Sequence, residues 1–198
     1  MLGTFFRHGA TAALAVFGLA LAALIALGFA PFRPLDVVIG ALLFYGSEYV
    51  MHRFAFHAPP ARIAFVKRLQ HRLHYDHHVE PDRLDLLFLP LWFLVPNLAV
   101  TAALVALVLG PAATASTMLG VAAAILHYEW THFVAHTPIR PLTPLGRWIK
   151  QYHLRHHYIS EKLWFGVSNP SLDFVFGTFR RPNEAKRSAK VRRLHPWA

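Results

Sequence analysis

The sequence predicts an all-α integral membrane protein, in which four transmembrane helices form two hairpins and a cytoplasmic helical cap holds a histidine-rich di-metal site. Three observations predict this fold class. The chain of 198 residues is 55% hydrophobic and 15% charged, whereas an average soluble domain is about 25% charged. Basic residues gather in alternate loops, and most of the 14 histidines fall in four short clusters. The length suits one domain, so we expect residues 1–198 to form a single membrane domain.

Four segments are long and apolar enough to be membrane spans, since a helix needs about 20 apolar residues to cross the hydrocarbon core. They cover residues 11–30, 35–52, 86–109 and 113–134. A secretory signal peptide is the alternative for the first segment. That segment exceeds the usual apolar region of roughly 7–15 residues, which favours a retained helix. Short turns after the first and third spans pair the helices into two hairpins.

Lysine and arginine are distributed unevenly between the loops. The turns at 31–34 and 110–112 together contain a single basic residue, Arg33. Residues 53–85 and the region after the fourth span are rich in basic side chains. Basic loops stay in the cytoplasm, so we expect both termini on that side of a bacterial inner membrane. The cytoplasmic part then comprises a cap at 53–85 and 135–180 and a basic tail at 181–198. Topology therefore explains the net charge of +10, and no nucleic-acid partner is expected.

The histidines form two pairs and two triplets. They are His52-Arg-Phe-Ala-Phe-His57, His74-Tyr-Asp-His77-His78, His132-Phe-Val-Ala-His136 and His153-Leu-Arg-His156-His157. Each residue of an α-helix advances about 100°, so an i, i+3, i+4 triplet places three imidazoles on one face. His52 and His57 lie about 140° apart on an ideal helix and share a site only if the helix ends or bends between them. The repeated triplet beside two pairs predicts metal binding.

The number of clustered imidazoles predicts two metal ions. Ten exceed the three or four protein ligands usual at one zinc ion, and suit two metals with about five ligands each. The predicted ligands are His52, His57, His74, His77, His78, His132, His136, His153, His156 and His157. Imidazole binds iron, zinc and copper alike, so the ligand type does not choose the metal. The chain has no cysteine, which excludes iron–sulfur clusters and thiolate-ligated haem.

Four further side chains are candidates for orienting the ligating imidazoles from the side that faces away from the metal. They are Glu48, His71, Asp76 and Glu129. The two glutamates each lie one turn before the first histidine of a pair, and carboxylates commonly orient ligating imidazoles. A salt bridge to a nearby arginine is the alternative for both. No side chain other than the metal ligands is predicted to be catalytic.

The order of these clusters resembles the fatty acid hydroxylase and sterol desaturase superfamily, and the fatty acid 2-hydroxylases in particular. As in that group, Glu48-Tyr49 precedes the first pair and Thr131 precedes the second. A Gly-Val-Ser segment and a Gly-Thr-Phe ending follow within residues 164–179, and the resemblance covers about residues 40–180. Within this segment we expect Trp164 to anchor at the membrane interface, where tryptophan is enriched.

The resemblance implies O2-dependent insertion of a hydroxyl group into a fatty acyl chain, at carbon 2. It implies two iron ions, although zinc can occupy such sites, and a lipid substrate from the membrane. It also implies an external electron donor, either cytochrome b5-like or a ferredoxin with its reductase, because the chain is too short for the cytochrome b5 domain fused to some members.

Other functions compete with this one. A carotenoid hydroxylase or a sterol-type desaturase of the same superfamily would use nearly the same ligands. A haem electron carrier needs only about two histidines. A metal transporter needs polar ligands along its spans, which the first and third spans lack.

Overall fold

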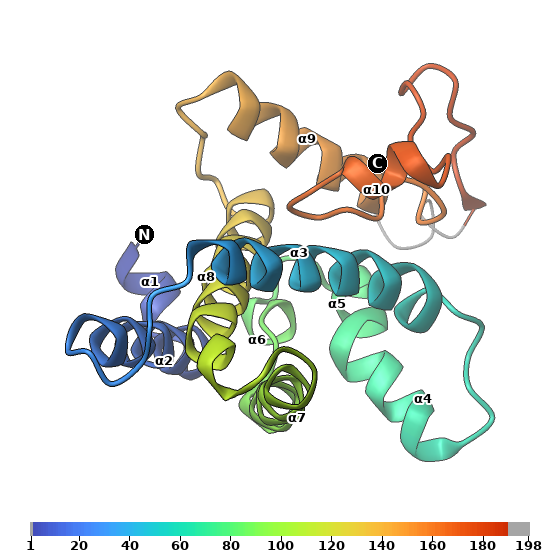
Figure 1. The fold of residues 1–198 in the computed structure, drawn as a ribbon. Helices are drawn as coiled ribbons and strands as arrows, with labels where there is room; N and C mark the ends of the chain where they lie inside the picture. Colours follow the sequence, from blue (N-terminus) through green and yellow to red (C-terminus); the bar gives the residue numbers. More distant parts are fainter. Residues whose placement is uncertain (1, 190–198) are drawn as a thin grey trace. The chain divides into compact units, whose positions relative to one another are not determined.

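The structure is a computed structural model that describes residues 2–189, and every regular element in that range is a helix (Figure 1). The all-α prediction is thereby confirmed for this part of the chain. The helices divide between two compact units, which are described separately. The span unit comprises the residues up to Tyr45 together with Phe88–Glu129, and the histidine unit comprises Gly46–Leu87 and the described residues from Trp130 onward.

The span unit is built from long apolar helices around a small core. Its elements are α1 (Leu2–Phe6), α2 (Gly9–Ala26), most of α3 (Pro34–Val50), α7 (Leu91–Leu109) and most of α8 (Pro111–Ala135). Helices α2, α7 and α8 supply the buried core residues, which are Leu14, Leu94, Met118, Val121, Ala122 and Ile125. Many other large apolar side chains of these helices are exposed, as expected where lipid covers the surface.

Helix α3 begins where the sequence favours a helix start. Pro34 occupies the first helical position, where its missing N–H removes no hydrogen bond. Arg33 forms an ion pair with Asp36 in the first turn, and its backbone N–H donates to Ser116 Oγ of α8 at 3.0 Å. Ser116 Oγ donates in turn to Pro31 O at 3.1 Å. These bonds tie the turn before α3 to the beginning of α8.

Three stretches within the described residues are long and apolar enough to cross a membrane. They are Gly9–Ala26, Pro34–Phe56 and Leu84–Leu109. The sequence predicted four spans, and the fourth, at 113–134, lies in α8. That helix has 25 residues and is therefore long enough, but Thr, Ser, His and Glu side chains make it less apolar than the other three.

The third predicted span is not one unbroken helix. Helix α6 (Leu84–Leu87) ends before Pro90, and α7 begins at Leu91. The residue before a proline is disfavoured in the helical conformation, which explains the break at Leu89. The N–H of Leu89 instead donates to Glu129 Oε1 at 3.0 Å. Glu129 therefore supports the start of α7.

The histidine unit is made of short helices and two π-helical segments. Besides the ends of α3 and α8 it contains η1 (Met51–Phe56), α4 (Ala64–Gln70), η2 (His71–Tyr75), α5 (Asp76–Val79), α6, α9 (Pro144–Tyr158) and α10 (Ser171–Val175). The Thr143 side chain caps α9 by accepting from the Gly146 N–H at 3.0 Å, and Pro144 follows it at the first helical position. Of the predicted basic tail at 181–198, residues 190–198 lie outside the described part.

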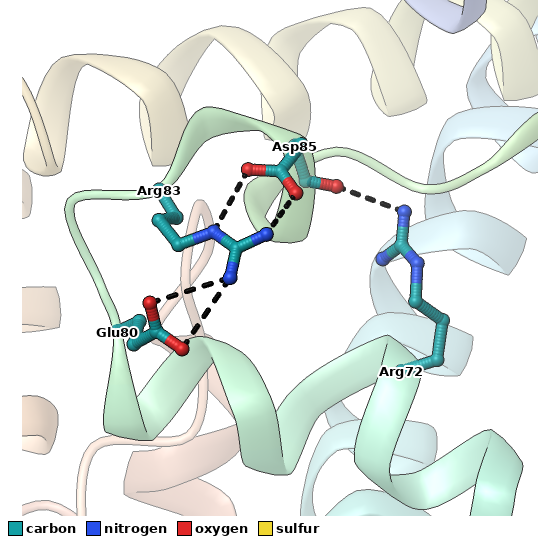
Figure 2. A network of polar contacts seen from close by, with 4 residues as sticks. All are labelled: Arg72, Glu80, Arg83 and Asp85. Carbon is teal, nitrogen blue, oxygen red and sulfur yellow. Dashed lines mark hydrogen bonds and ion pairs between the residues drawn. The ribbon is translucent and has the colours of Figure 1, made fainter.

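A polar network closes the loop between α5 and α6 (Figure 2). The Arg83 guanidinium donates to both carboxylate oxygens of Asp85, at 3.2 and 2.6 Å, and lies 3.3 Å from Glu80 Oε2. Arg72 of η2 reaches the same loop and donates to Asp85 O at 2.8 Å. The carboxylates are exposed, so solvent screens each ion pair and its contribution to stability is small. The network fixes a loop and places no carboxylate beside a histidine.

Candidate metal centre

The structure brings the ten clustered histidines into two groups of five, both within the histidine unit. The first group contains His52, His57, His74, His78 and His156. The second group contains His77, His132, His136, His153 and His157. In each group, one ring nitrogen per residue lies within 4.8 Å of all the others. Each group could therefore hold one metal ion.

Each triplet is divided between the two groups. His74 and His78 belong to the first group and His77 to the second, whereas His153 and His157 belong to the second and His156 to the first. Helical geometry explains the division, because residues i and i+4 are about 40° apart and residue i+3 lies about 60° to the other side. Each group thus combines a pair, the outer members of one triplet and the middle member of the other triplet.

The first pair shares a site because α3 continues as a π-helix. The His57 N–H donates to His52 O at 3.1 Å, which is the i to i+5 hydrogen bond of π-helical turns. Such a turn contains an extra residue, so positions i and i+5 come close to one face. The spacing predicted that the helix ends or bends between His52 and His57, but the structure instead widens the helical turn to a π-helix over the segment η1. Short π-helical segments of this kind occur often at functional sites.

In both groups, Nε2 atoms of different histidines face one another at short distances. In the first, His74 Nε2 lies 3.2 Å from His52 Nε2 and 2.7 Å from His57 Nε2. In the second, His132 Nε2 lies 3.0 Å from His77 Nε2. These distances suit donor atoms around one ion, since zinc–imidazole bonds are about 2.0–2.1 Å long.

The hydrogen bonds behind the rings show that a cation fits this arrangement. Nδ1 of His52 contacts Phe165 O, and Nδ1 of His156 lies 2.7 Å from Leu163 O. A carbonyl oxygen only accepts, so Nδ1 carries the proton in both rings and the neutral ring presents a lone pair at Nε2. Since His52 and His156 accept at Nε2, both His74 and His57, whose Nε2 atoms face them at 3.2 and 2.9 Å, would have to donate there. The Nε2 atoms of His74 and His57 also lie 2.7 Å apart, where two N–H groups repel each other. A metal ion between them removes this repulsion.

Burial keeps the cap histidines in the form that binds metal. It lowers the pKa of His77 to about 3, and it lowers the pKa values of His74 and His153 well below 6.5. Neighbouring imidazoles add to the effect, because a second positive charge nearby is unfavourable. These rings are therefore neutral at pH 7, which is the protonation state of a metal-bound histidine.

The carbonyls behind His52 and His156 belong to a buried segment, called here the 163–168 turn. The carboxylate of Glu48 accepts from the N–H groups of Val167 and Ser168 at 2.7 and 3.1 Å and from Ser168 Oγ at 2.6 Å. The Glu48 carboxylate thus binds groups of this turn, whereas the sequence predicted that it would orient an imidazole directly. It supports His52 through the backbone.

Trp164 is a buried part of this turn. Its side chain is 0% exposed, and its indole N–H donates to Arg180 O at 3.0 Å, so the expectation of an interfacial anchor is wrong. Its φ of 59° is left-handed, a conformation that costs a bulky residue about 1–3 kcal/mol and persists only where the surroundings impose it. The hydrogen bond from the Trp164 N–H to Thr178 O, at 3.1 Å, helps to impose it.

The other three candidate orienting residues lie outside the two groups. His71 Nδ1 and Asp76 Oδ1 are 3.0 Å apart, and both side chains are nearly half exposed. Glu129 is 2% exposed and contacts the Leu89 N–H through Oε1. The hydrogen bonds described for these residues are to each other or to the Leu89 backbone, and not to a histidine of either group.

Comparison with known proteins supports a metal-binding role for the two histidine groups. The model of the fatty acid hydroxylase family matches residues 37–178, which include all ten histidines. The chain belongs to the fatty acid hydroxylase family. With its three candidate spans, this hydroxylase-family chain is an integral membrane protein.

Individual relatives share about a third of the aligned residues. The ceramide very long chain fatty acid hydroxylase SCS7 of Saccharomyces cerevisiae is 34% identical over 73% of this chain and 38% of its own length. The dihydroceramide fatty acyl 2-hydroxylase FAH1 of Arabidopsis thaliana is 32% identical over 72% of this chain and 59% of its own length. The fatty acid 2-hydroxylase of Rattus norvegicus is 31% identical over 75% of this chain and 40% of its own length.

A solved structure supports the same relationship. It is described as full-length scs7p with only the hydroxylase domain visible, and it matches with a TM-score of 0.74 at 29% identity. The match covers 89% of this chain and 67% of that chain. This chain spans between 38% and 59% of the length of the yeast and plant relatives, so their activities apply to it only as a proposal.

Proposed function

We propose that this member of the fatty acid hydroxylase family is a membrane-bound di-iron hydroxylase that inserts a hydroxyl group at carbon 2 of a fatty acyl chain. The observation that carries the proposal is the pair of buried five-histidine groups. Each of the ten histidines is proposed as a metal ligand. The relatives are fatty acid or fatty acyl hydroxylases, which supports an acyl substrate over a carotenoid or a sterol.

Two iron ions, when bound, supply the reduction of O2 and the removal of hydrogen from an unactivated C–H bond. Zinc suits the same imidazoles but has no redox chemistry, so iron is the proposed active metal. One oxygen atom enters the acyl chain and the other leaves as water, which requires two electrons and two protons per turnover. A separate redox protein, either cytochrome b5-like or a ferredoxin with its reductase, is the proposed donor of these electrons.

The activity is tested by expression in a host that lacks 2-hydroxylated lipids, with iron, a reductase system and 18O2 supplied. Mass spectrometry of the hydrolysed lipids is expected to show 2-hydroxy fatty acids that carry one 18O atom. A matched strain expressing His77→Ala is expected to show none. If iron-loaded protein with a working reductase leaves the lipids unchanged, the proposal is wrong, and a new double bond would indicate a desaturase instead.

We also propose four spans, with α8 as the fourth, both termini in the cytoplasm and all described residues within one membrane domain. The chain has no cysteine, so a single introduced thiol reports its own side of the membrane. Ala112→Cys, at the start of α8, is expected to react with a membrane-impermeant maleimide on intact spheroplasts. Arg62→Cys, in the cap, is expected to react only after lysis. Labelling of both from the same side would contradict the four-span arrangement.

A further inference from the structure

The structure assigns a positioning role to Asp173: its carboxylate fixes the 163–168 turn, and this turn orients ligands of the first histidine group but not of the second. The inference rests on the proposed two-metal function. It adds that the two sites differ in how they are supported, and that one buried carboxylate outside both groups controls one site only.

The Asp173 carboxylate accepts hydrogen bonds from the turn and from the segment that follows α10. It is 0% exposed. Its Oδ1 accepts from the Phe165 N–H at 2.9 Å and from Thr178 Oγ1 at 2.6 Å. Its Oδ2 accepts from the Gly166 N–H at 2.7 Å. The carboxylate thus fixes two successive peptide groups of the turn, and both of its oxygens act only as acceptors.

The turn is fixed from its other end by Glu48, through Val167 and Ser168. It is also tight, because a Cβ atom added at Gly166 would lie 2.3 Å from Asn169 O. Two buried carboxylates therefore determine the backbone from Phe165 to Ser168. Neither carboxylate needs to contact an imidazole to influence the site.

The effect reaches the metal site through two carbonyl groups. Phe165 O and Leu163 O accept from Nδ1 of His52 and His156, and both histidines belong to the first group. A shift of the turn would rotate both rings and move their Nε2 atoms. Outer partners of this kind set the orientation of ligating imidazoles, and losing one typically lowers metal affinity or activity 10–100-fold.

Two ligands of the second group, His77 and His153, lack such a carbonyl partner within residues 2–189. The Nε2 atoms of His77 and His153 face other histidines of that group, at 3.0 Å from His132 and His136 respectively. Their outer Nδ1 atoms are buried and have no hydrogen-bond partner among residues 2–189. The 163–168 turn therefore distinguishes the two sites, and disturbing this turn should weaken metal binding at the first group only.

The test measures Zn2+ binding to the full chain in detergent, by equilibrium dialysis against buffered zinc and elemental analysis. Asp173→Asn preserves the shape of the side chain but replaces one acceptor oxygen with an NH2 group, which then faces a backbone N–H donor of the turn. Wild type is expected to bind two zinc ions, and Asp173→Asn to hold one at the original affinity and one 10–100-fold more weakly. Asp85→Asn, which alters an exposed carboxylate in the network of Figure 2, is the matched control and should change neither affinity.

Single-site backgrounds identify the affected group. In His77→Ala, which leaves the first group intact, Asp173→Asn should weaken the tight site 10–100-fold. In His74→Ala, which leaves the second group intact, Asp173→Asn should change affinity by less than about twofold, as for independent sites. Equal weakening in both backgrounds, or no weakening in either, would overturn the inference. If Asp173→Asn does not fold, Thr178→Val removes one donor to the same carboxylate, and the same two outcomes decide. Wild type that binds no metal would instead contradict the proposed function itself.

Discussion

Replacing His156 and His157 by alanine is expected to affect different metal ions, although the two residues are adjacent in the sequence. Both side chains are fully buried, but His156 belongs to the first group and His157 to the second. Each single variant should lose one metal ion, and hydroxylation should fall by at least the roughly 100-fold that loss of an outer partner can cause. Elemental analysis and lipid profiling measure the two effects.

Double variants make this prediction specific to the structure. His156→Ala with His78→Ala removes two ligands of the same group, so one metal ion should remain per chain. His156→Ala with His157→Ala removes one ligand from each group, so no ion should remain tightly bound. His71→Ala is the control, because that side chain is nearly half exposed and pairs with Asp76. The opposite pattern in the double variants would show that the histidines are grouped differently.

Much of the metal centre can be predicted from residue spacing. The i, i+3, i+4 triplets place imidazoles on one side of a helix, and burial leaves them few partners other than a metal. Spacing alone does not show that each triplet contributes to both groups, because this depends on where the second triplet lies in space. The contribution of His57 depends in addition on the π-helical segment η1, which no local propensity predicts.

The 163–168 turn is the part of the site that sequence analysis missed. Its functional atoms are the carbonyls of Leu163 and Phe165, and every residue has a carbonyl. The signal available was indirect, because the Gly-Val-Ser segment counted only as a point of resemblance. Buried polar residues in a short irregular segment need partners, and this requirement could have drawn attention to Asp173 and Ser168.

Replacing Gly120 by alanine is expected to destabilise the span unit strongly. A Cβ atom at Gly120 would lie 2.0 Å from Val37 O, and one at Gly40 would lie 1.9 Å from Thr117 O. Helices α3 and α8 therefore approach backbone to backbone at two reciprocal points. Small residues allow such contact between helices in lipid, where packing replaces the hydrophobic effect. Because backbone cannot move as a side chain does, we expect a loss of at least about 1–3 kcal/mol, measured by denaturation in detergent.

Gly18→Ala, in α2, provides the matched control, because its Cβ atom would meet the Ala122 side chain of α8 at 3.8 Å, an ordinary contact. It should be neutral or stabilise by up to about 1 kcal/mol, as expected for removing a glycine from a helix. Gly40→Ala should destabilise as Gly120→Ala does. The two changes separate the same pair of helices, so the double variant should lose less than the sum of the single losses. Full additivity, or a harmless Gly120→Ala, would show that α3 and α8 do not pack this closely.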